Sequence, residues 1–337
     1  MNQLKQTAAT EILAKIHALT DSADLSSSDI VGMFEYPPDP KMGDLAFPCF
    51  KLAKTLRQAP PKIAAALAEG LSVPGISRVD VAGGYLNMFT DKSGMAANTV
   101  NTILEKKENY GANDEGVGKT VVLDYSSPNV AKPFHIGHLG TTVIGHSLKK
   151  LHAFCGYNCV GINHLGDWGT QFGKMIVAYK RWGDRATVEA GECDALVDLY
   201  VKFHEEAEKD PSLNDEARAV FTAMEHGEPE YMELWKWIID ISLREYEKTY
   251  KQLGITFDSY AGESFYTDKM PAVVDELKAS NIMVIDDGAS IVDLSEYNMP
   301  PCLILKRDGS TLYPARDIAA ALYRKKTYNF DKCIYVT

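Results

Sequence analysis

Apolar side chains recur at helical spacing over the first 20 residues of the chain. They are Leu4, Ala8, Ile12, Ile16 and Leu19. A period of three to four residues predicts an amphipathic helix, and the absence of a continuous apolar core argues against a secretory signal. Further helices are predicted over about residues 45–56, 60–69 and 94–107. The second of these has proline in its first turn and Gly70 just past its end, as is typical of helix boundaries.

The segment RVDVAGGYLNMFT (78–90) contains two strand-like runs separated by two glycines, which predicts a β-hairpin. Together with the helices, this hairpin predicts a small α+β domain. The loop NYGANDEGVG (109–118) follows the last helix. We place the domain boundary in this loop, so that the two domains span residues 1–112 and 113–337.

From residue 119 onwards, strand and helix patterns alternate. KTVVLDY (119–125) and NCVGIN (158–163) are predicted to be buried strands, and helices are predicted over about 136–154 and 170–181. A helix that returns the chain to the same edge of a sheet makes the two strands parallel. This alternation therefore predicts an α/β fold with a parallel, Rossmann-like sheet.

Residues 184–299 are predicted to be a largely helical insertion in this domain, and its longest amphipathic stretch ends at Gly254. CLILKRDGSTLY (302–313) then has apolar runs on both sides of Asp308 and Gly309, which predicts a hairpin.

A helix over about 316–325 and a buried strand at CIYV (333–336) are the last predicted elements. In a doubly wound sheet a helix normally follows such a strand. We therefore expect the chain to be a fragment that is cut within its α/β domain.

The net charge of −11 is concentrated in one part of the chain. Residues 191–250 contain 16 acidic and 6 basic side chains, whereas residues 1–112 contain 12 acidic and 11 basic ones. We interpret the acidic region as a solvated helical face, so the charge does not exclude a polyanionic ligand. The sequence contains no run of about 18 apolar residues, so we expect no membrane span. Six cysteines in a chain of this length fit a reducing cytoplasm better than a disulfide framework.

The segment SSPNVAKPFHIGHLG (126–140) connects the first strand of the predicted sheet to its helix, and its two histidines allow two interpretations. A zinc site would need ligands in addition to His135 and His138. The candidates are His152, Cys155, Cys159 and His164. They form no paired C-x₂-C motif, and free cysteines are common in protein cores. We therefore expect no metal ion held by the protein alone.

Nucleotide binding is the interpretation that we favour for this segment. A helix that begins after the first strand of a parallel sheet presents backbone N–H groups and its positive dipole end to phosphate. Gly137 allows close approach, His135 and His138 can donate hydrogen bonds to phosphate oxygens, and Lys132 adds a cation. Neither a G-x-G-x-x-G nor a P-loop consensus is present, which argues against NAD enzymes and P-loop NTPases.

The motif PFHIGH resembles the HIGH signature of class I aminoacyl-tRNA synthetases. The longer segments DYSSPNVAKPFHIGHL, NHLGDWGTQFG and DGSTLYPARDIAAALYR are similar to arginyl-tRNA synthetases. GDLAFPCFKLAK and VAGGYLNMF resemble the additional N-terminal tRNA-binding domain of that family. The resemblance covers essentially the whole chain. It implies a class I, HIGH-type catalytic domain with a helical insertion, preceded by a small α+β domain, with the anticodon-binding domain and the second signature absent.

The resemblance also implies a reaction and its ligands. Enzymes of this family use ATP, accompanied by Mg²⁺, to activate L-arginine as arginyl-adenylate and then transfer it to the 3′ end of tRNA(Arg). The expected partners are thus L-arginine, ATP and tRNA(Arg), with no DNA and no membrane. We expect the 337-residue chain to fold but to have little or no aminoacylation activity alone. The alternatives are a small-molecule nucleotidyltransferase of the H-x-G-H type and a non-catalytic tRNA-binding fragment.

Site residues are carried over from the resemblance position by position. The catalytic residues would be His135, His138 and Lys132. The ATP-binding residues would be Pro128, Asn129, Lys132, His135, Ile136, Gly137 and His138. The arginine-binding residues would be Asp124, Ser127, Asn129, His138, Tyr313 and Asp317.

The proposed pair for the arginine side chain also makes chemical sense. A guanidinium group favours a carboxylate and an aromatic face, and positions 313 and 317 lie on one side of a helix start. The simpler alternative is that Tyr313 packs in the core and Asp317 caps the helix. Gly140 departs from the family, because many members have arginine there.

Overall fold

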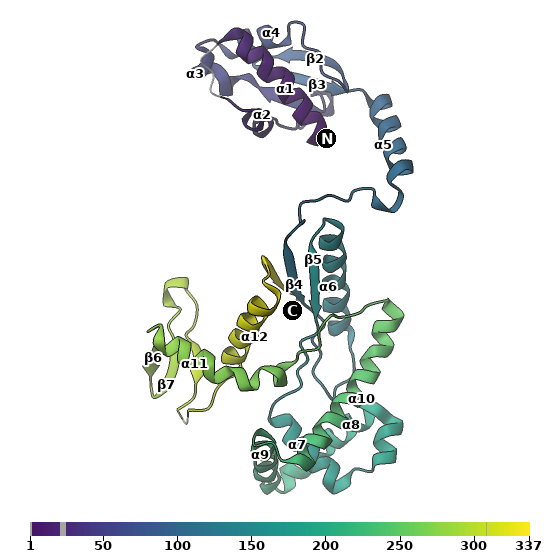
Figure 1. Cartoon of the computed structure of the whole chain (residues 1–337), viewed down its shortest axis with the longest axis vertical. Coiled ribbons are helices and arrows are strands. Elements are labelled where there is room, and N and C mark those ends of the chain that lie inside the picture. Colours follow the sequence, from purple (N-terminus) through teal and green to yellow (C-terminus); the bar gives the residue numbers. More distant parts are fainter. Residues whose placement is uncertain (1, 21–24, 308) are drawn as a thin grey trace. The chain divides into compact units, whose positions relative to one another are not determined.

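The computed structural model describes residues 2–20, 25–307 and 309–337 (Figure 1). The chain divides into two compact units, Met1–Tyr110 and Gly111–Thr337. Each unit has its own hydrophobic core. None of the described helices is both long and apolar enough to cross a lipid bilayer.

The first unit contains a three-stranded antiparallel sheet in the order β1-β3-β2. Its strands are β1 (Leu45–Pro48), β2 (Ile76–Ala82) and β3 (Tyr85–Thr90). The predicted hairpin is confirmed, because β2 and β3 pair directly across the two glycines. The predicted helix over 45–56 is wrong in its first half. A short, continuously apolar run fits a buried strand as well as a helix, and here β1 pairs with β3 and all four of its residues are buried.

Five α-helices complete the described part of the first unit, and the last of them has no buried residue. They are α1 (Asn2–Leu19), α2 (Ser27–Met33), α3 (Ala53–Leu56), α4 (Pro60–Ala68) and α5 (Lys92–Lys106). The predicted amphipathic pattern of α1 is confirmed for Ala8, Ile12 and Ile16, which are fully buried, whereas Leu19 is 44% exposed. The sequence prediction missed α2, although Ser26 and Asp29 form a capping box that was readable from their spacing.

The second unit contains a parallel sheet in the order β5-β4-β9, which confirms the α/β prediction. Its strands are β4 (Thr120–Asp124), β5 (Asn158–Ile162) and β9 (Lys332–Tyr335). Helix α6 (Ile136–Phe154) connects β4 to β5, and α7 (Thr170–Trp182) follows β5. Because the strands are parallel, their carboxyl ends meet at one edge of the sheet, where the loops after β4 and β5 lie together.

Residues 185–253 are mostly helical, as predicted. They form α8 (Arg185–Lys209), α9 (Ser212–Glu225) and α10 (Pro229–Leu253). These helices share a core with α7 that includes Phe172, Phe203 and Ile238. Helices α7 and α9 approach so closely that a Cβ at Gly173 would lie 2.1 Å from the carbonyl oxygen of Ala217.

The insertion that we predicted to be largely helical over about 184–299 also contains strands in its last part. After α11 (Met270–Ala279), the strands β6 (Met283–Asp286) and β7 (Ala289–Val292) form a hairpin. The turn residues Asp287 and Gly288 both have positive φ angles, as an Asp-Gly hairpin turn requires. The Asp-Gly pair indicates this hairpin in the sequence, but the hairpin was not predicted.

The hairpin predicted around Asp308 and Gly309 is only partly correct. The strand β8 (Cys302–Leu305) pairs along its length with β7, and the chain beyond the turn adds one bridge, between Leu305 and Thr311. Asp308 lies outside the described residues. The last helix, α12 (Tyr313–Tyr328), begins three residues earlier than predicted because Pro314 in its first turn already has a helical φ.

Two glycines of α6 lie in opposite surroundings. A Cβ at Gly140 would meet no atom within 4 Å, whereas a Cβ at Gly145 would lie 2.2 Å from Cβ of Tyr125. Gly145 therefore lets α6 approach the chain just after β4, and Gly140 has no such role. Glycine inside a helix costs about 1 kcal/mol relative to alanine.

We expect Gly140→Ala to raise the free energy of unfolding by roughly 0.5–1 kcal/mol. Gly145→Ala, its matched control on the same helix, should lower it by about 1–3 kcal/mol through overpacking. Urea unfolding of both variants measures the two shifts. Equal shifts of the same sign would contradict the packing described for α6.

Candidate active site

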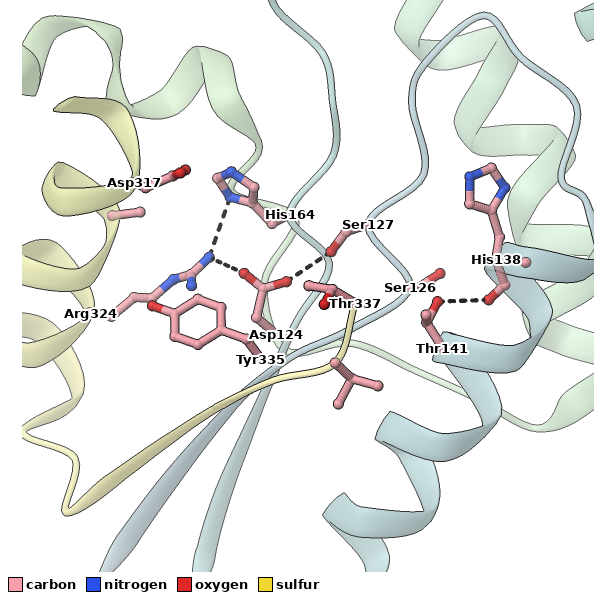
Figure 2. Close-up of a pocket in the computed structure, with 13 residues that line it drawn as sticks. Asp124, Ser126, Ser127, His138, Thr141, His164, Asp317, Arg324, Tyr335 and Thr337 are labelled. Carbon is pink, nitrogen blue, oxygen red and sulfur yellow. Dashed lines mark hydrogen bonds and ion pairs between the residues drawn. The ribbon is translucent and has the colours of Figure 1, made fainter. Parts of the chain in front are cut away.

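A cavity of about 610 Å³ opens at the carboxyl edge of the parallel sheet (Figure 2). Its walls come from the end of β4, the start of α6, the loop after β5, the inner face of α12 and the end of β9. Four of the six residues expected to bind arginine lie on this cavity. They are Asp124, Ser127, His138 and Asp317.

The loop after β4 has an unusual backbone. Ser126, Ser127 and Ala131 have φ angles of 75°, 46° and 62°, in the left-handed region that non-glycine residues rarely adopt. Such residues persist where the surrounding structure fixes them, often at ligand sites. The loop is fixed by hydrogen bonds from Ser127 N–H to Asn163 Oδ1 (3.0 Å) and from Ala131 N–H to Ser242 Oγ of α10 (3.0 Å).

Buried hydroxyl groups extend this support. The hydroxyls of Ser126 and Tyr250 lie 2.7 Å apart, and Asn163 Nδ2 donates to the Tyr250 oxygen at 3.0 Å. Burial raises the pKa of Tyr250 to about 12, so its hydroxyl remains protonated at neutral pH. Thr142 of α6 lies 2.7 Å from the Ser126 hydroxyl and 2.6 Å from the carbonyl oxygen of His138. One polar network thus joins α10, the loop and the first turn of α6.

The two histidines of the motif cap helix α6. Nδ1 of His135 accepts a hydrogen bond from the Gly137 N–H at 3.1 Å, and Nδ1 of His138 lies 3.4 Å from the His135 nitrogen. The backbone N–H groups of His135 and Gly137, which we expected to face phosphate, thus already have side-chain acceptors. An imidazole that accepts at Nδ1 is neutral and carries its proton on Nε2. Both rings, stacked 3.7 Å apart, can thus donate from Nε2.

The electrostatic surroundings keep His138 neutral. Burial is the main cause that lowers the pKa of His138 below its ordinary value, and the neighbouring His135 and Lys132 lower it further. A neutral imidazole with a fixed N–H is a donor that can strengthen a hydrogen bond to a phosphate oxygen as negative charge develops there.

The residues expected to bind ATP lie on two different cavities or on neither. Gly137 and His138 line the cavity at the sheet edge, whereas Asn129, Lys132 and His135 line a second cavity of about 580 Å³. That second cavity lies against α7 and α8, with Phe172 and Val197 in its wall. Pro128 and Ile136 line neither cavity, and Ile136 is 81% exposed.

Tyr313 does not join Asp317 in the cavity. It is 69% exposed and lies on a separate hollow with Trp168 and Arg316. Tyr313 is the first residue of α12, one turn before Asp317, but the two side chains line different hollows, so they do not share the sheet-edge cavity. Tyr313 does not pack in the core either. Trp168, in contrast, is a core residue at 9% exposed.

Asp124 has a partner that the sequence prediction missed. Oδ2 of Asp124 lies 2.7 Å from Nη2 of Arg324, and Oδ1 accepts a hydrogen bond from Ser127 Oγ at 2.8 Å (Figure 2). Arg324 is on α12 and is only 1% exposed. Burial alone would lower its pKa, but the Asp124 carboxylate raises the pKa of Arg324 above the ordinary value.

Asp317 is the other carboxylate of the cavity. Within the described part of the chain, it makes no hydrogen bond or ion pair of its own. Burial raises the pKa of Asp317, although His164, Arg316 and Arg324 lower it in part. A partly buried carboxylate without a partner is costly and favours a cationic ligand.

The residues considered for zinc have other contacts. His152 Nδ1 lies 2.8 Å from the Leu148 carbonyl oxygen, Cys159 Sγ lies 3.6 Å from the Tyr157 carbonyl oxygen, and His164 lines the sheet-edge cavity. Among the residues that the structure describes, no three histidine, cysteine or acidic side chains are grouped so as to hold a metal ion.

Comparison with protein families assigns almost the whole chain. Residues 99–337 match the family model "tRNA synthetases class I (R), catalytic domain", and residues 6–90 match "Arginyl tRNA synthetase N terminal domain". The arginine–tRNA ligase of Alkaliphilus metalliredigens (strain QYMF) is 54% identical over 319 residues, covering 94% of this chain and 56% of the relative. That of Clostridium beijerinckii (strain ATCC 51743 / NCIMB 8052) is 56% identical over 313 residues, covering 93% and 56%.

Solved structures show the same fold. The arginyl-tRNA synthetase of Plasmodium falciparum superimposes with a TM-score of 0.70 at 23% identity, covering 97% of this chain and 57% of that one. The Thermus thermophilus enzyme has a TM-score of 0.64 at 21% identity, covering 95% and 53%. The chain spans about 56% of the length of the curated relatives it matches. By these family matches and identities, the chain belongs to the class I arginyl-tRNA synthetases.

Proposed function

We propose that the whole protein joins L-arginine to tRNA(Arg) in two steps: activation by ATP to arginyl-adenylate, and transfer to the 3′ end of the tRNA. Membership in the family favours this reaction over that of a small-molecule nucleotidyltransferase. The observation that carries the proposal is the pairing, in one cavity, of the unpartnered carboxylate of Asp317 with the neutral donor of His138. The first suits a cationic amino acid and the second a reacting phosphate.

In this proposal the guanidinium of the substrate binds Asp317, and its α-amino and carboxylate ends lie near Ser127, close to the loop after β4. The substrate carboxylate then attacks the α-phosphorus of ATP, and pyrophosphate leaves. Nε2–H of His138 donates to an oxygen of the α-phosphate, where charge increases in the transition state. The cation of Lys132 and Nε2–H of His135 lie beside the second cavity, and we assign them to the outer phosphates.

Mg²⁺ would arrive with the nucleotide, because a magnesium ion is commonly held by substrate phosphates and water with few protein ligands. The first unit, whose residues 6–90 match the N-terminal domain of the family, is proposed to bind tRNA. A location in the cytoplasm stays a prediction.

Two measurements test the proposal. Calorimetry should detect L-arginine binding to the protein, and ATP–pyrophosphate exchange should require L-arginine in an assay that includes tRNA(Arg). An exchange reaction that is independent of arginine, or binding of an alcohol substrate in preference to arginine, would contradict the proposed substrate.

The 337-residue chain alone is expected to charge tRNA(Arg) at less than about one hundredth of the rate of a longer relative of the same family, because it spans only about 56% of the length of such relatives. Filter assays with radioactive arginine measure this ratio, with the longer relative as the positive control. Comparable rates would show that these residues suffice.

A further inference from the structure

Helix α10 contacts the loop after β4 through three buried side chains that carry hydroxyl groups. Ser242, Tyr246 and Tyr250 follow one another at intervals of four residues, which places them on one face of the helix. Ser242 accepts from the Ala131 N–H, and Tyr250 contacts the start of the loop. Tyr246 lies between them on the helix, and its hydroxyl contacts the part of the loop that carries Lys132.

The hydroxyl of Tyr246 joins two backbone carbonyl groups of this loop. Its oxygen lies 2.7 Å from the carbonyl oxygen of Asn129 and 2.7 Å from that of Lys132, so the two acceptors share one hydroxyl hydrogen. No other side chain of the described residues donates to either carbonyl. Tyr246 is fully buried, and burial raises the pKa of Tyr246 above its ordinary value. The hydroxyl therefore stays protonated and remains a donor.

The turn between these two carbonyl groups has a backbone shape that its sequence does not favour. Ala131 has a φ angle of 62°, and a non-glycine residue stays in this left-handed region only when its surroundings hold it there. Pro133 restricts the backbone of the preceding lysine to extended conformations. The hydrogen bonds from α10 thus hold the turn in a shape that it would otherwise leave, and the position of the Lys132 backbone depends on them.

Lys132 is the residue of this turn with a free charge. It is exposed, it lines the second cavity, and it makes no ion pair with a described residue. An ammonium on a flexible stem stabilises a phosphate only if its backbone is held at the right distance. A displacement of about 1 Å can lower a rate by about 10²-fold. The reach of this cation is therefore sensitive to the contacts that fix the turn.

We propose that Tyr246 is a positioning residue for Lys132: through the two carbonyl groups, its hydroxyl holds the lysine backbone where the ammonium reaches the outer phosphates of ATP. Tyr246 itself does not touch the substrate. This inference rests on the proposed function and deepens it, because it starts from the assignment of Lys132 to those phosphates.

The test is a double-mutant cycle in the whole protein, read by ATP–pyrophosphate exchange with tRNA(Arg) present. Tyr246→Phe removes the hydroxyl and keeps the ring. It should lower kcat at least about tenfold, or about 1.4 kcal/mol, and raise the KM for ATP, with the KM for L-arginine within about twofold of normal. Lys132→Ala should lower kcat at least about a hundredfold. The double variant should match Lys132→Ala to within about twofold, since no cation is left to position.

Tyr250→Phe is the matched control, because it removes a buried hydroxyl of the same helix whose partners are Ser126 and Asn163 and not the lysine turn. It should change kcat by the same factor with and without Lys132→Ala. Melting temperatures are measured in parallel, because a merely structural hydroxyl would lower them while its effect on kcat did not depend on Lys132. If Tyr246→Phe does not fold, Ser242→Ala removes the other contact from α10 to the turn and should show the same dependence on Lys132.

An unchanged kcat in Tyr246→Phe would overturn the inference, and so would an equal loss with and without Lys132→Ala. If the effect of Tyr250→Phe also disappeared with Lys132→Ala, the coupling would belong to the whole loop, and Tyr246 would have no specific role. An unchanged rate in Lys132→Ala would instead contradict the assignment of this lysine in the proposed function. The two failures are therefore distinguishable in the same cycle.

Discussion

Replacing Asp317 by asparagine is expected to weaken L-arginine binding by roughly 30-fold or more, because truncating one member of a desolvated charge pair typically costs at least about 2 kcal/mol. ATP affinity should change by less than about twofold, since Asp317 lies on α12, across the cavity from the first turn of α6. Calorimetry with each ligand separately measures both effects. Equal losses for arginine and ATP would contradict the assignment of this carboxylate.

The same substitution should have the opposite effect on stability. Burial raises the pKa of Asp317 in the folded protein, so its ionisation opposes folding. The more favourable, protonated state is fully present below the unfolded pKa of about 3.9, and its benefit is lost as pH rises through the higher folded value. Asp317→Asn should therefore raise the melting temperature at pH 7 and have no such effect at acidic pH. Asp317 would then favour binding at the expense of stability.

Asp275→Asn on α11 is the matched control for these measurements, because Asp275 is an exposed aspartate that does not line the sheet-edge cavity. It should leave arginine affinity and the melting temperature near those of the unsubstituted protein. If it reproduced the changes seen with Asp317→Asn, the effects would belong to net charge and not to the cavity.

His138→Ala is expected to lower the rate of adenylate formation by about 10²–10³, the usual loss when one transition-state hydrogen-bond donor is removed. Arginine and ATP should bind with affinities within a few-fold of normal, because the donated hydrogen bond strengthens mainly in the transition state. Pre-steady-state ATP–pyrophosphate exchange in the whole protein measures the rate, and calorimetry measures the two affinities.

His138→Gln should recover part of the lost rate, since the glutamine amide can place an N–H near the position of Nε2. His152→Ala, at the other end of α6 and away from the cavity, is the control and should leave the rate unchanged. A loss of arginine and ATP affinity as large as the loss of rate would show that His138 holds the ground state instead.

Much of the second unit could be predicted from local patterns. Helix α6 follows the predicted bounds, and β4, β5 and β9 are parallel as expected, because their apolar runs are separated by helices. The secondary-structure predictions are wrong where a local pattern fits both a helix and a strand, or where a turn pattern was not used. Leu45–Pro48 is apolar enough for either a helix or a strand, and its pairing with β3, some 40 residues later, decides for the strand.

In the candidate site, too, the sequence did not reveal contacts between distant segments of the chain. The sequence indicated the loop after β4 and the two histidines, because they directly precede a helix. It did not indicate Arg324, Tyr250 or Asn163, whose roles depend on contacts between segments far apart in the chain. A basic residue two turns after Asp317 on α12 was the one available sign of Arg324, and no partner could be named from the sequence.

Helix α10 carries a consequence for how the protein is made. The strained loop after β4 is held by Ser242 and Tyr250, which follow their loop partners by 111 and 124 residues. A growing polypeptide on the ribosome thus exposes the histidine motif long before the groups that shape it have been synthesised. The ability to bind substrate should therefore appear late in synthesis. A substitution in the middle of α10 should weaken substrate binding, although the substituted residue does not contact the substrate.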